Sequence, residues 1–199
     1  MPSASPTSIS VFASSSTSLQ FNWSPVPVLM RNGPIVSYTI YYQRVNGPRV
    51  HGAFSDHCAV NTNGFCSLSI NAPASSITIP SLEKYVNYTV QISAWTAVGE
   101  GKLSGLVSSL TSPDIPQGTV QNVATNSPSS TSVFVSWDPP VITLQNGPIQ
   151  GYRVSWTRID SAYTNPALPK TAVILPSLLV VGIAGISNTV ASSITISGM

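Results

Sequence analysis

The motif Asn32-Gly33-Pro34-Ile35, with Tyr38 three residues after it, decides how the chain is organised because it occurs twice. It recurs as Asn146-Gly147-Pro148-Ile149, again with a tyrosine, Tyr152, three residues after it. The offset between the two copies is 114 residues (146 − 32). A period this long predicts two domains of one fold rather than a solenoid of short units.

The repeat extends on both sides of this motif. Trp23 recurs as Trp137 at the same offset. Further along, Ser75-Ser76-Ile77-Thr78-Ile79 recurs as Ser192-Ser193-Ile194-Thr195-Ile196 at an offset of 117 (192 − 75). The second copy has therefore gained three residues between the motif and this segment.

Apolar and polar residues alternate along several segments of both copies. Alternation at period two with one apolar parity is typical of antiparallel strands that bury one face. Helical periodicity is nowhere sustained. We therefore expect an all-β fold built of two-sheet sandwiches. The apolar parities are Leu19, Phe21 and Trp23; Tyr38, Ile40 and Tyr42; Tyr88, Val90, Ile92 and Ala94; Val133, Val135 and Trp137; and Tyr152, Val154 and Trp156.

The composition narrows the classes of function. Of the 199 residues, 42% are hydrophobic, which is enough for a buried core and argues against disorder. Only 7% are charged, and the net charge is +2, so the chain has no basic cluster that could follow a phosphate backbone. Long-range steering of charged substrates is not expected either, so we expect neither nucleic acid nor a small-molecule substrate as a ligand.

The residues needed for catalysis are scarce. The chain has two histidines, His51 and His57, and six carboxylates, and none of them falls in a hydrolase, metalloprotease or phosphate-loop motif. The segment Gly99-Glu100-Gly101-Lys102 comes nearest to a phosphate loop, but Leu103 follows the lysine where a hydroxyl residue should hold magnesium. We expect a surface turn there, and no catalytic, cofactor-binding or metal-ligating residues.

Both copies share further features in a fixed order. Trp and Pro stand near the end of each expected second strand, in Trp23-Ser24-Pro25 and in Trp137-Asp138-Pro139-Pro140. In the first copy, Leu82 precedes Tyr88 by six residues, and Val98-Gly99-Glu100-Gly101 follows. With the Asn-Gly-Pro-Ile turn, this order resembles two fibronectin type III domains in tandem. The resemblance implies an immunoglobulin-like β-sandwich for each copy, with a tyrosine corner at Leu82 and Tyr88.

The large aromatic residues are expected in the core rather than along a ligand groove, because they lie on the inward parity of their strands. Trp95 lies on the outward parity, where it either contacts a partner or packs against a neighbouring loop. The expected structural core residues are Trp23, Tyr38, Leu82, Tyr88, Trp137 and Tyr152.

The resemblance also predicts the domain limits. A complete domain is expected at residues 1–112, a linker at 113–116 and a partial domain at 117–199. Pro113 and Pro116 favour an extended, semi-rigid linker. Met199 is the counterpart of Leu82, so the second domain is expected to lack its last strands, those that correspond to 88–94 and 103–110. We expect either that the sequence belongs to a longer chain or that another chain covers the exposed sheet edge.

The most apolar stretch, residues 172–186, is shorter than the roughly 20 residues of a membrane-spanning helix and contains Pro176. Its Val and Ile content favours a buried strand and turn over a membrane segment.

Two cysteines, Cys58 and Cys66, allow two interpretations. A local disulfide needs Cys58 opposite Cys66, with a five-residue loop from Val60 to Gly64. A tight turn at Asn63-Gly64 would instead place Cys58 opposite Ser69 and leave free thiols. The fibronectin type III family usually lacks disulfides, so this pair departs from its pattern.

Two triplets match the N-glycosylation pattern, and they start at Asn22 and Asn87. Both asparagines fall on the outward parity, which suits glycosylation of a secreted chain. The start of the chain has neither a basic region nor an apolar run, so no signal peptide is expected in it.

Three functions are compatible with these features. The first is a non-catalytic extracellular adhesion or receptor module, part of a longer and membrane-anchored protein, that provides spacing and protein–protein contact through loops or sheet faces. The second is an accessory ectodomain region of an enzyme such as a receptor-type tyrosine phosphatase. The third is an intracellular fibronectin type III scaffold, which free thiols and absent glycans would select.

Overall fold

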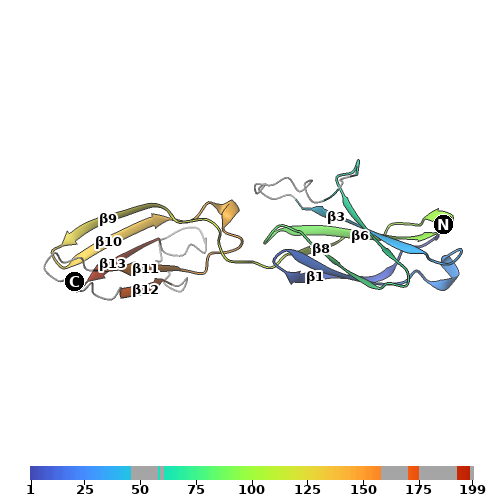
Figure 1. Ribbon diagram of the computed structural model, residues 1–199, viewed down its shortest axis with the longest axis horizontal. Helices are drawn as coiled ribbons and strands as arrows, with labels where there is room; N and C mark the ends of the chain where they lie inside the picture. The colour runs from blue at the N-terminus through green and yellow to red at the C-terminus, as the bar shows by residue number, and fades with distance from the viewer. Residues whose placement is uncertain (46–57, 59–60, 158–169, 175–191, 198–199) are drawn as a thin grey trace, which may run out of the picture. The chain divides into compact units, whose positions relative to one another are not determined.

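The computed structural model describes residues 1–45, 58, 61–157, 170–174 and 192–197. The chain divides into two compact units, Met1–Ile115 and Pro116–Met199, each of which is a set of antiparallel strands (Figure 1). The expectation of an all-β fold is confirmed. The helical elements among the described residues are two single 3₁₀ turns, η1 (Val28–Met30) and η3 (Ile142–Leu144).

The first sheet of unit 1 has the strand order β1-β2-β5. Its members are β1 (Thr7–Ser15), β2 (Ser18–Ser24) and β5 (Ser76–Ile79). In β2, every second residue is buried, because Leu19, Phe21 and Trp23 share the face that meets the other sheet.

The second sheet of unit 1 has the order β4-β3-β6-β7, and β8 also pairs with β6. Its members are β3 (Ser37–Arg44), β4 (Cys66–Asn71), β6 (Asn87–Thr96), β7 (Gly99–Glu100) and β8 (Val107–Leu110). The last strand, expected near 103–110, is present as the shorter β8, and part of the predicted surface turn forms the two-residue strand β7. Between β7 and β8, Ser104 takes the place of regular strand pairing with β6. Its backbone N–H donates to the carbonyl of Ile92, and its hydroxyl oxygen accepts a hydrogen bond from the N–H of Ile92.

The core of unit 1 lies between these two sheets. Trp23 and Tyr38 come from opposite sheets, and their ring centroids lie 5.2 Å apart. Strand β6 covers the space beside them with Tyr88, Val90 and Ile92, all fully buried. The remaining buried apolar members are Leu19, Phe21, Val26, Ile40, Tyr42, Cys66, Ile79, Leu82, Val86 and Ala94.

Unit 2 repeats the first part of this plan. One sheet has the order β13-β10-β9, and the other pairs β11 with β12. The members are β9 (Gln121–Ser129), β10 (Ser132–Asp138), β11 (Tyr152–Trp156), β12 (Lys170–Ile174) and β13 (Ser193–Ser197).

The repeat is preserved in the strand register. Leu19 pairs with Ile79 in unit 1, and their counterparts Val133 and Ile196 pair in unit 2. The turn before the third strand is preserved as well, since Asn32 and Asn146 both have a φ of 54° and Gly33 and Gly147 have φ values of 137° and 138°. Asn and Gly are the residues that tolerate positive φ most readily, which explains why this turn marks the repeat.

Burial differs between the units. Trp137 and Ile196 are buried, but Val133, Val135, Tyr152, Val154 and Trp156 are only half-buried, so the expectation of a buried face is not met at these five positions. Their counterparts in unit 1 are covered by β6, and no counterpart of β6 occurs among the described residues of unit 2. Of the apolar stretch 172–186, the described part is the end of β12, where Val173 is exposed, and the rest lies outside the described residues.

We expect Trp23→Ala to lower the free energy of unfolding of unit 1 by about 3–5 kcal/mol, the usual cost of removing a large buried aromatic. Trp23 is 4% exposed and packs on Phe21 and Tyr38. The loss of unfolding free energy is measured by denaturant titration, and hydrogen exchange of the Ile92 amide assigns that loss to unit 1. Phe12→Ala on the same sheet is the control, because Phe12 is 50% exposed and should cost less than about 1 kcal/mol. Equal effects of the two changes would show that Trp23 is not a core residue.

Candidate functional site

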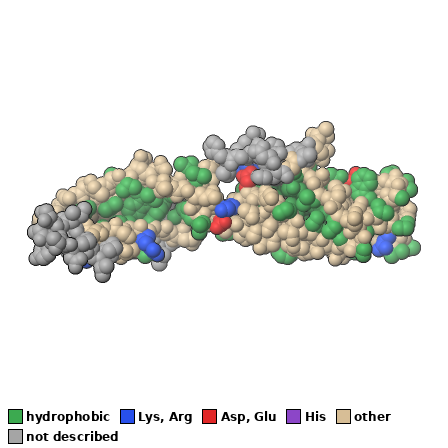
Figure 2. All heavy atoms as spheres, viewed as in Figure 1, with side chains coloured by type: hydrophobic (Ala, Val, Ile, Leu, Met, Phe, Trp, Pro, Cys, Tyr) green, Lys and Arg blue, Asp and Glu red, His purple; other side chains and the backbone are tan. Residues whose placement is uncertain are grey.

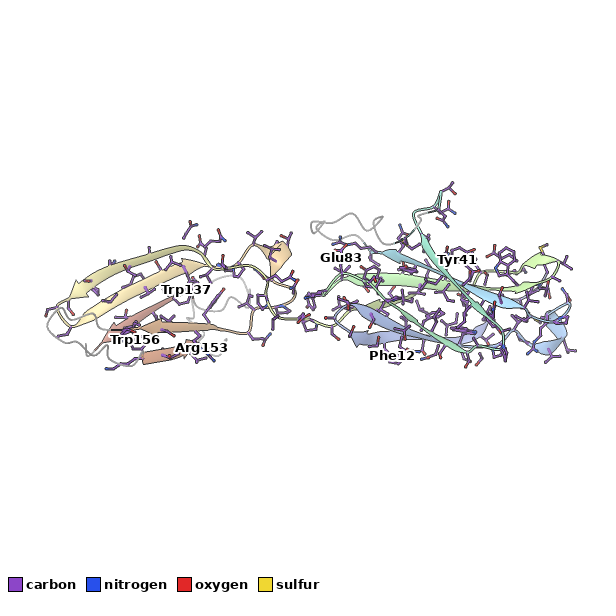
Figure 3. The ribbon with its side chains drawn as sticks, in the orientation of Figure 1. Phe12, Tyr41, Glu83, Trp137, Arg153 and Trp156 are labelled. Carbon is purple, nitrogen blue, oxygen red and sulfur yellow. A yellow bond between two sulfur atoms is a disulfide. The ribbon has the colours of Figure 1, made fainter. Side chains whose placement is uncertain are left out.

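The outer face of the second sheet in unit 1 carries a hydrogen-bonded cluster of Tyr41, Ser93 and Glu100. Both hydroxyls donate to Oε1 of Glu100, over 2.7 Å from Tyr41 and 2.6 Å from Ser93. Ser93 is fully buried although it lies on the outward parity of β6. Trp95, on the same parity, is half-buried. The side chains on this face are therefore polar but closely packed. Figure 3 labels Tyr41 on this face.

Burial, together with the hydrogen bond and the charge of Glu100, raises the pKa of Tyr41 from 10.0 to about 12. Burial also raises the pKa of Tyr88 to about 12. Both tyrosines hold their proton more tightly in the folded chain than in the unfolded chain. Their contribution to stability is therefore complete below about pH 10 and is lost as the pH rises towards about 12.

We expect Glu100→Gln to lower the pKa of Tyr41, because the amide still accepts the hydrogen bond but carries no charge. The pKa should stay above 10.0, since burial is the largest cause of the shift. An NMR titration of the tyrosine ring carbons measures it, and Tyr88 is the internal control because Glu100 is not among the causes of its shift. An unchanged pKa of Tyr41 would contradict the proposed role of the carboxylate.

The tyrosine-corner residues lie at the start of β6. The hydroxyl of Tyr88 accepts a hydrogen bond of 2.9 Å from the backbone N–H of Glu83. The carboxylate of Glu83 forms an ion pair of 3.0 Å with Arg44 on β3. Leu82 is buried beside them, and its N–H bonds the carbonyl of Thr17. The connection before β6 is thus attached both to β3 and to the turn after β1.

An exposed apolar patch lies at one end of unit 1. It consists of Val28, Leu29 and Met30 on η1, Val98 in the turn between β6 and β7, and Met1, and we call it the loop-end patch. Leu29 is 95% exposed, Val98 78% and Val28 72%. The segments meet through three contacts. The N–H of Ser3 donates to the carbonyl of Met30 over 2.9 Å, the side chain of Asn32 donates to the carbonyl of Met1 over 3.0 Å, and the side chain of Met1 lies beside Gly99, the residue after Val98. Figure 2 shows hydrophobic side chains at the end of the unit where the chain begins in Figure 1.

Such a patch is typical of a surface that contacts another protein. The sequence reasoning did not single it out, because η1 carries no motif. The sequence feature that indicates this surface is the run of apolar residues from Val26 to Met30, in which Pro27 also lies. The run falls in a loop of the fold, where apolar residues are unusual.

The structure joins Cys58 and Cys66 in a disulfide, with their Cα atoms 5.7 Å apart. The turn beside it is neither of the two expected turns. The N–H of Asn61 bonds the carbonyl of Phe65 over 2.9 Å, and Gly64 has a φ of 81°. Three residues therefore close the turn, with glycine at the left-handed position that such loops require. His51 and His57 lie outside the described residues.

We expect peptide mapping without reductant to recover Cys58 and Cys66 in one linked pair when the chain is produced in an oxidising compartment. Closing so short a loop should contribute about 2.5 kcal/mol of stability on the chain-entropy model. The control is the same map after reduction and alkylation. Two free thiols in the unreduced sample would contradict the pairing and would favour the intracellular interpretation.

The two predicted glycosylation sites differ in their surroundings. The side chain of Asn22 lies on the outer face of β2, half-buried, within hydrogen-bonding distance of Gln20 and Ser10. Asn87 is exposed at the first residue of β6. Asn87 is therefore the more accessible acceptor of the two, and modification of either stays a prediction.

Both ends of the predicted linker are attached to their own unit. In unit 1, Asp114 accepts hydrogen bonds from Ser16 over 2.9 Å and forms an ion pair of 3.0 Å with Lys84. The lysine, the N–H of Ile115 and Ser16 lower the pKa of Asp114 to about 2. In unit 2, the N–H groups of Gln117 and Gly118 both donate to the carbonyl of Leu144. The predicted limits 1–112, 113–116 and 117–199 stay a prediction.

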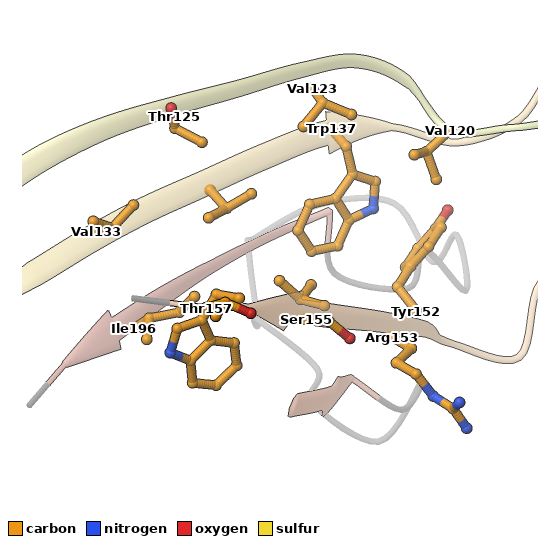
Figure 4. A pocket seen from close by; sticks show the side chains of 13 residues that line it. Val120, Val123, Thr125, Val133, Trp137, Tyr152, Arg153, Ser155, Thr157 and Ile196 are labelled. Atoms are coloured by element: carbon orange, nitrogen blue, oxygen red, sulfur yellow. The ribbon is translucent and has the colours of Figure 1, made fainter. Parts of the chain in front are cut away.

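An open apolar groove lies between the two sheets of unit 2. Its volume is about 590 Å³. Figure 4 shows side chains of β9 and β10 facing those of β11 across it, with Trp137 and Tyr152 at one end. These two rings are 5.2 Å apart, the same distance as their counterparts in unit 1. The lining residues are Val120, Val123, Thr125, Val133, Val135, Trp137, Tyr152, Arg153, Val154, Ser155, Trp156, Thr157 and Ile196.

The described residues contain no group of three or more His, Cys, Asp or Glu side chains placed to hold a metal ion. In the same part of the chain, no helix is both long and apolar enough to cross a bilayer.

Comparison with known proteins gives the family. The fibronectin type III domain profile matches residues 4–109 and 118–182. The chain is 34% identical over 160 residues to receptor-type tyrosine-protein phosphatase F of Danio rerio, covering 80% of this chain and 8% of that protein. The identity to the Bos taurus protein of the same name is 32% over 195 residues, or 98% of this chain and 10% of that protein.

A crystal structure of the FN5 domain of Drosophila Lar is 19% identical to the chain, with a TM-score of 0.41. That match covers 57% of this chain and all of that domain. The chain spans a tenth or less of the length of the two phosphatases it matches. The predicted tandem architecture is confirmed, and this domain type is not itself catalytic.

Proposed function

Because the chain belongs to the fibronectin type III family, we propose that it is a non-catalytic module of a cell-surface adhesion or receptor ectodomain, which sets spacing and contacts other proteins. The observation that carries the proposal is the loop-end patch. Apolar side chains as exposed as Leu29 and Val98 cost solubility unless a partner covers them.

The linker supports the spacing role. Asp114 is attached to unit 1 and Gln117 to unit 2, so few residues of the linker can rotate without breaking these contacts. Prolines at positions 113 and 116 restrict the backbone further. A short, restricted linker suits a module that transmits position along an ectodomain.

The extracellular location is supported by three features that agree with one another. The relatives named above are receptor-type proteins. The disulfide of Cys58 and Cys66 suits an oxidising compartment. Asn87 presents its acceptor side chain to solvent.

A narrower candidate is the ectodomain of a receptor-type tyrosine phosphatase, favoured by the identities of 34% and 32%. The chain is also 29% identical over 161 residues to mouse Protein sidekick-1, which is not named as a phosphatase. The coding sequence of the complete gene separates the two, because a phosphatase domain in the same reading frame would select the first.

The test uses the chain in a multivalent form that binds to cell surfaces, read by flow cytometry. We expect Leu29→Asp together with Val98→Asp to weaken binding about tenfold or more, because charge placed in an apolar contact is costly to bury. Phe12→Asp is the matched control, since Phe12 is also apolar and exposed but lies on β1. Equal loss in both variants, or no binding by the unaltered chain, would contradict the proposal.

A further inference from the structure

We propose that Asn87 carries an N-linked glycan whose first sugar, N-acetylglucosamine, packs over the exposed side chains of Leu110 and Val45. The glycan then covers an apolar part of the outer face of the second sheet in unit 1. This inference rests on the proposed function, because the modification takes place in the secretory pathway. It deepens that function by separating the surface that a glycan covers from the surface left to partners.

The backbone of Asn87 is held by the strands on both sides of it. Asn87 is the first residue of β6, and it pairs with Leu110 on β8. On the other side, its carbonyl accepts a hydrogen bond of 2.8 Å from the N–H of Val45, the residue after β3. The next residue, Tyr88, is fully buried, so the side chain of Asn87 points to the opposite face, where it is exposed. The acceptor amide therefore projects from a fixed backbone without disturbing the core.

Leu110 and Val45 flank this amide. Residues directly opposite each other in antiparallel strands point to the same face, and their Cβ atoms are roughly 4.5–5.5 Å apart. Leu110 is 42% exposed and Val45 is 37% exposed. The C–H face of a sugar ring is apolar, so a ring attached to Asn87 can remove part of both side chains from water. The contact needs no change of the strands.

Asn22 provides a contrast within the same unit. Its directly opposite residues are Ser10 and Ser76, which are polar, and Phe12 lies two positions further along β1. The Nδ2 atom of Asn22 donates to Oγ of Ser10 over 3.5 Å. A glycan at this position would replace that contact and would meet hydroxyl groups on both sides. Of the two triplets, the surroundings therefore favour Asn87 as the one at which a sugar packs on apolar side chains.

The modification is a group transfer, and its co-reactant is a lipid-linked oligosaccharide diphosphate of the secretory pathway. A bond forms between Nδ2 of Asn87 and the anomeric carbon of the first sugar, and the bond from that carbon to the diphosphate oxygen breaks. The lipid diphosphate leaves with the electron pair and takes up the proton that the amide loses. Thr89 supplies the hydroxyl that the triplet requires at its third position.

The position of the first sugar leaves the loop-end patch free. Asn87 begins β6, and Val98 lies just beyond its last residue, Thr96. These ends of β6 are nine residues apart (96 − 87), which corresponds to about 30 Å of extended strand. A sugar that packs on Leu110 therefore does not reach the patch, which stays available for contact with another protein.

The first experiment tests the attachment. The full chain is secreted from eukaryotic cells behind an added signal sequence and treated with an endoglycosidase that leaves one N-acetylglucosamine per site. We expect peptide mapping to find the mass of one such sugar on the peptide that contains Asn87. Thr89→Ala should remove it, and Thr89→Ser should retain it, because serine also satisfies the triplet. An unmodified Asn87 in a chain whose Cys58 and Cys66 are linked would overturn the proposal.

The second experiment tests the packing, and all chains in it carry Asn22→Gln so that every effect belongs to Asn87. We expect nuclear Overhauser effects between the ring protons of the sugar and the methyl groups of Leu110 and Val45. The chain with one sugar is also compared with the same chain from the bacterial periplasm, where no sugar is added. We expect the sugar to raise the thermal unfolding midpoint of unit 1, read from the NMR signals of β6, by about 2–4 °C.

A matched pair of substitutions assigns this shift to the proposed contact. Leu110→Ser should remove at least half of the shift. Leu103→Ser is the control, because Leu103 is 48% exposed but precedes Ser104, which bonds Ile92 rather than Asn87. It should leave the shift unchanged.

Two results would overturn the packing. They are a modified Asn87 without Overhauser effects to Leu110 and Val45, and an equal loss of the shift in both serine variants. The proposed function fails separately. A chain that carries the sugar but does not bind cells contradicts the proposed function alone, whereas a chain that binds cells with an unmodified Asn87 contradicts this inference alone.

Discussion

The pairing of β3 with β6 is the interaction on which the rest of unit 1 depends. It brings Tyr88, Val90 and Ile92 over the first sheet, and it leaves the outward side chains to form the polar face of Tyr41 and Glu100. A two-sheet sandwich can exclude water from its interior only when both layers extend over the same area. Where β6 is present, the core is closed. In unit 2, whose described residues include no counterpart of β6, Val133, Val135 and Tyr152 are only half-buried.

The sequence was sufficient to predict the fold because the alternation of apolar and polar residues is a local signal, and because the repeat shows the same pattern twice. The turn at Asn32 and Gly33 follows from residue types that tolerate positive φ. The inward aromatics could be assigned in the same way, since parity alone decides the face. Tyr152 was assigned less well, because burial of its counterpart Tyr38 also depends on the neighbouring strand β6, which lies far along the chain.

The surfaces were harder to predict. The exposure of Leu29 depends on which loops meet at one end of the unit, and the apolar run from Val26 to Met30 alone does not tell whether these side chains are buried or exposed. The turn beside the disulfide shows the same limit. Asn61 accepts two backbone N–H groups with its side chain, those of Asn63 and Phe65, and so selects a three-residue turn over the expected alternatives.

The attachment of Asp114 has a mechanical consequence. Ser16 follows β1 of the first sheet, whereas Lys84 lies in the connection that leads into β6 of the second sheet. Tension applied along the chain beyond Asp114 therefore does not peel β8 away directly. The load is instead shared between both sheets, because the hydroxyl of Ser16 and the ammonium group of Lys84 both bind the carboxylate of Asp114. These contacts reduce the force that reaches β8, the last strand of unit 1.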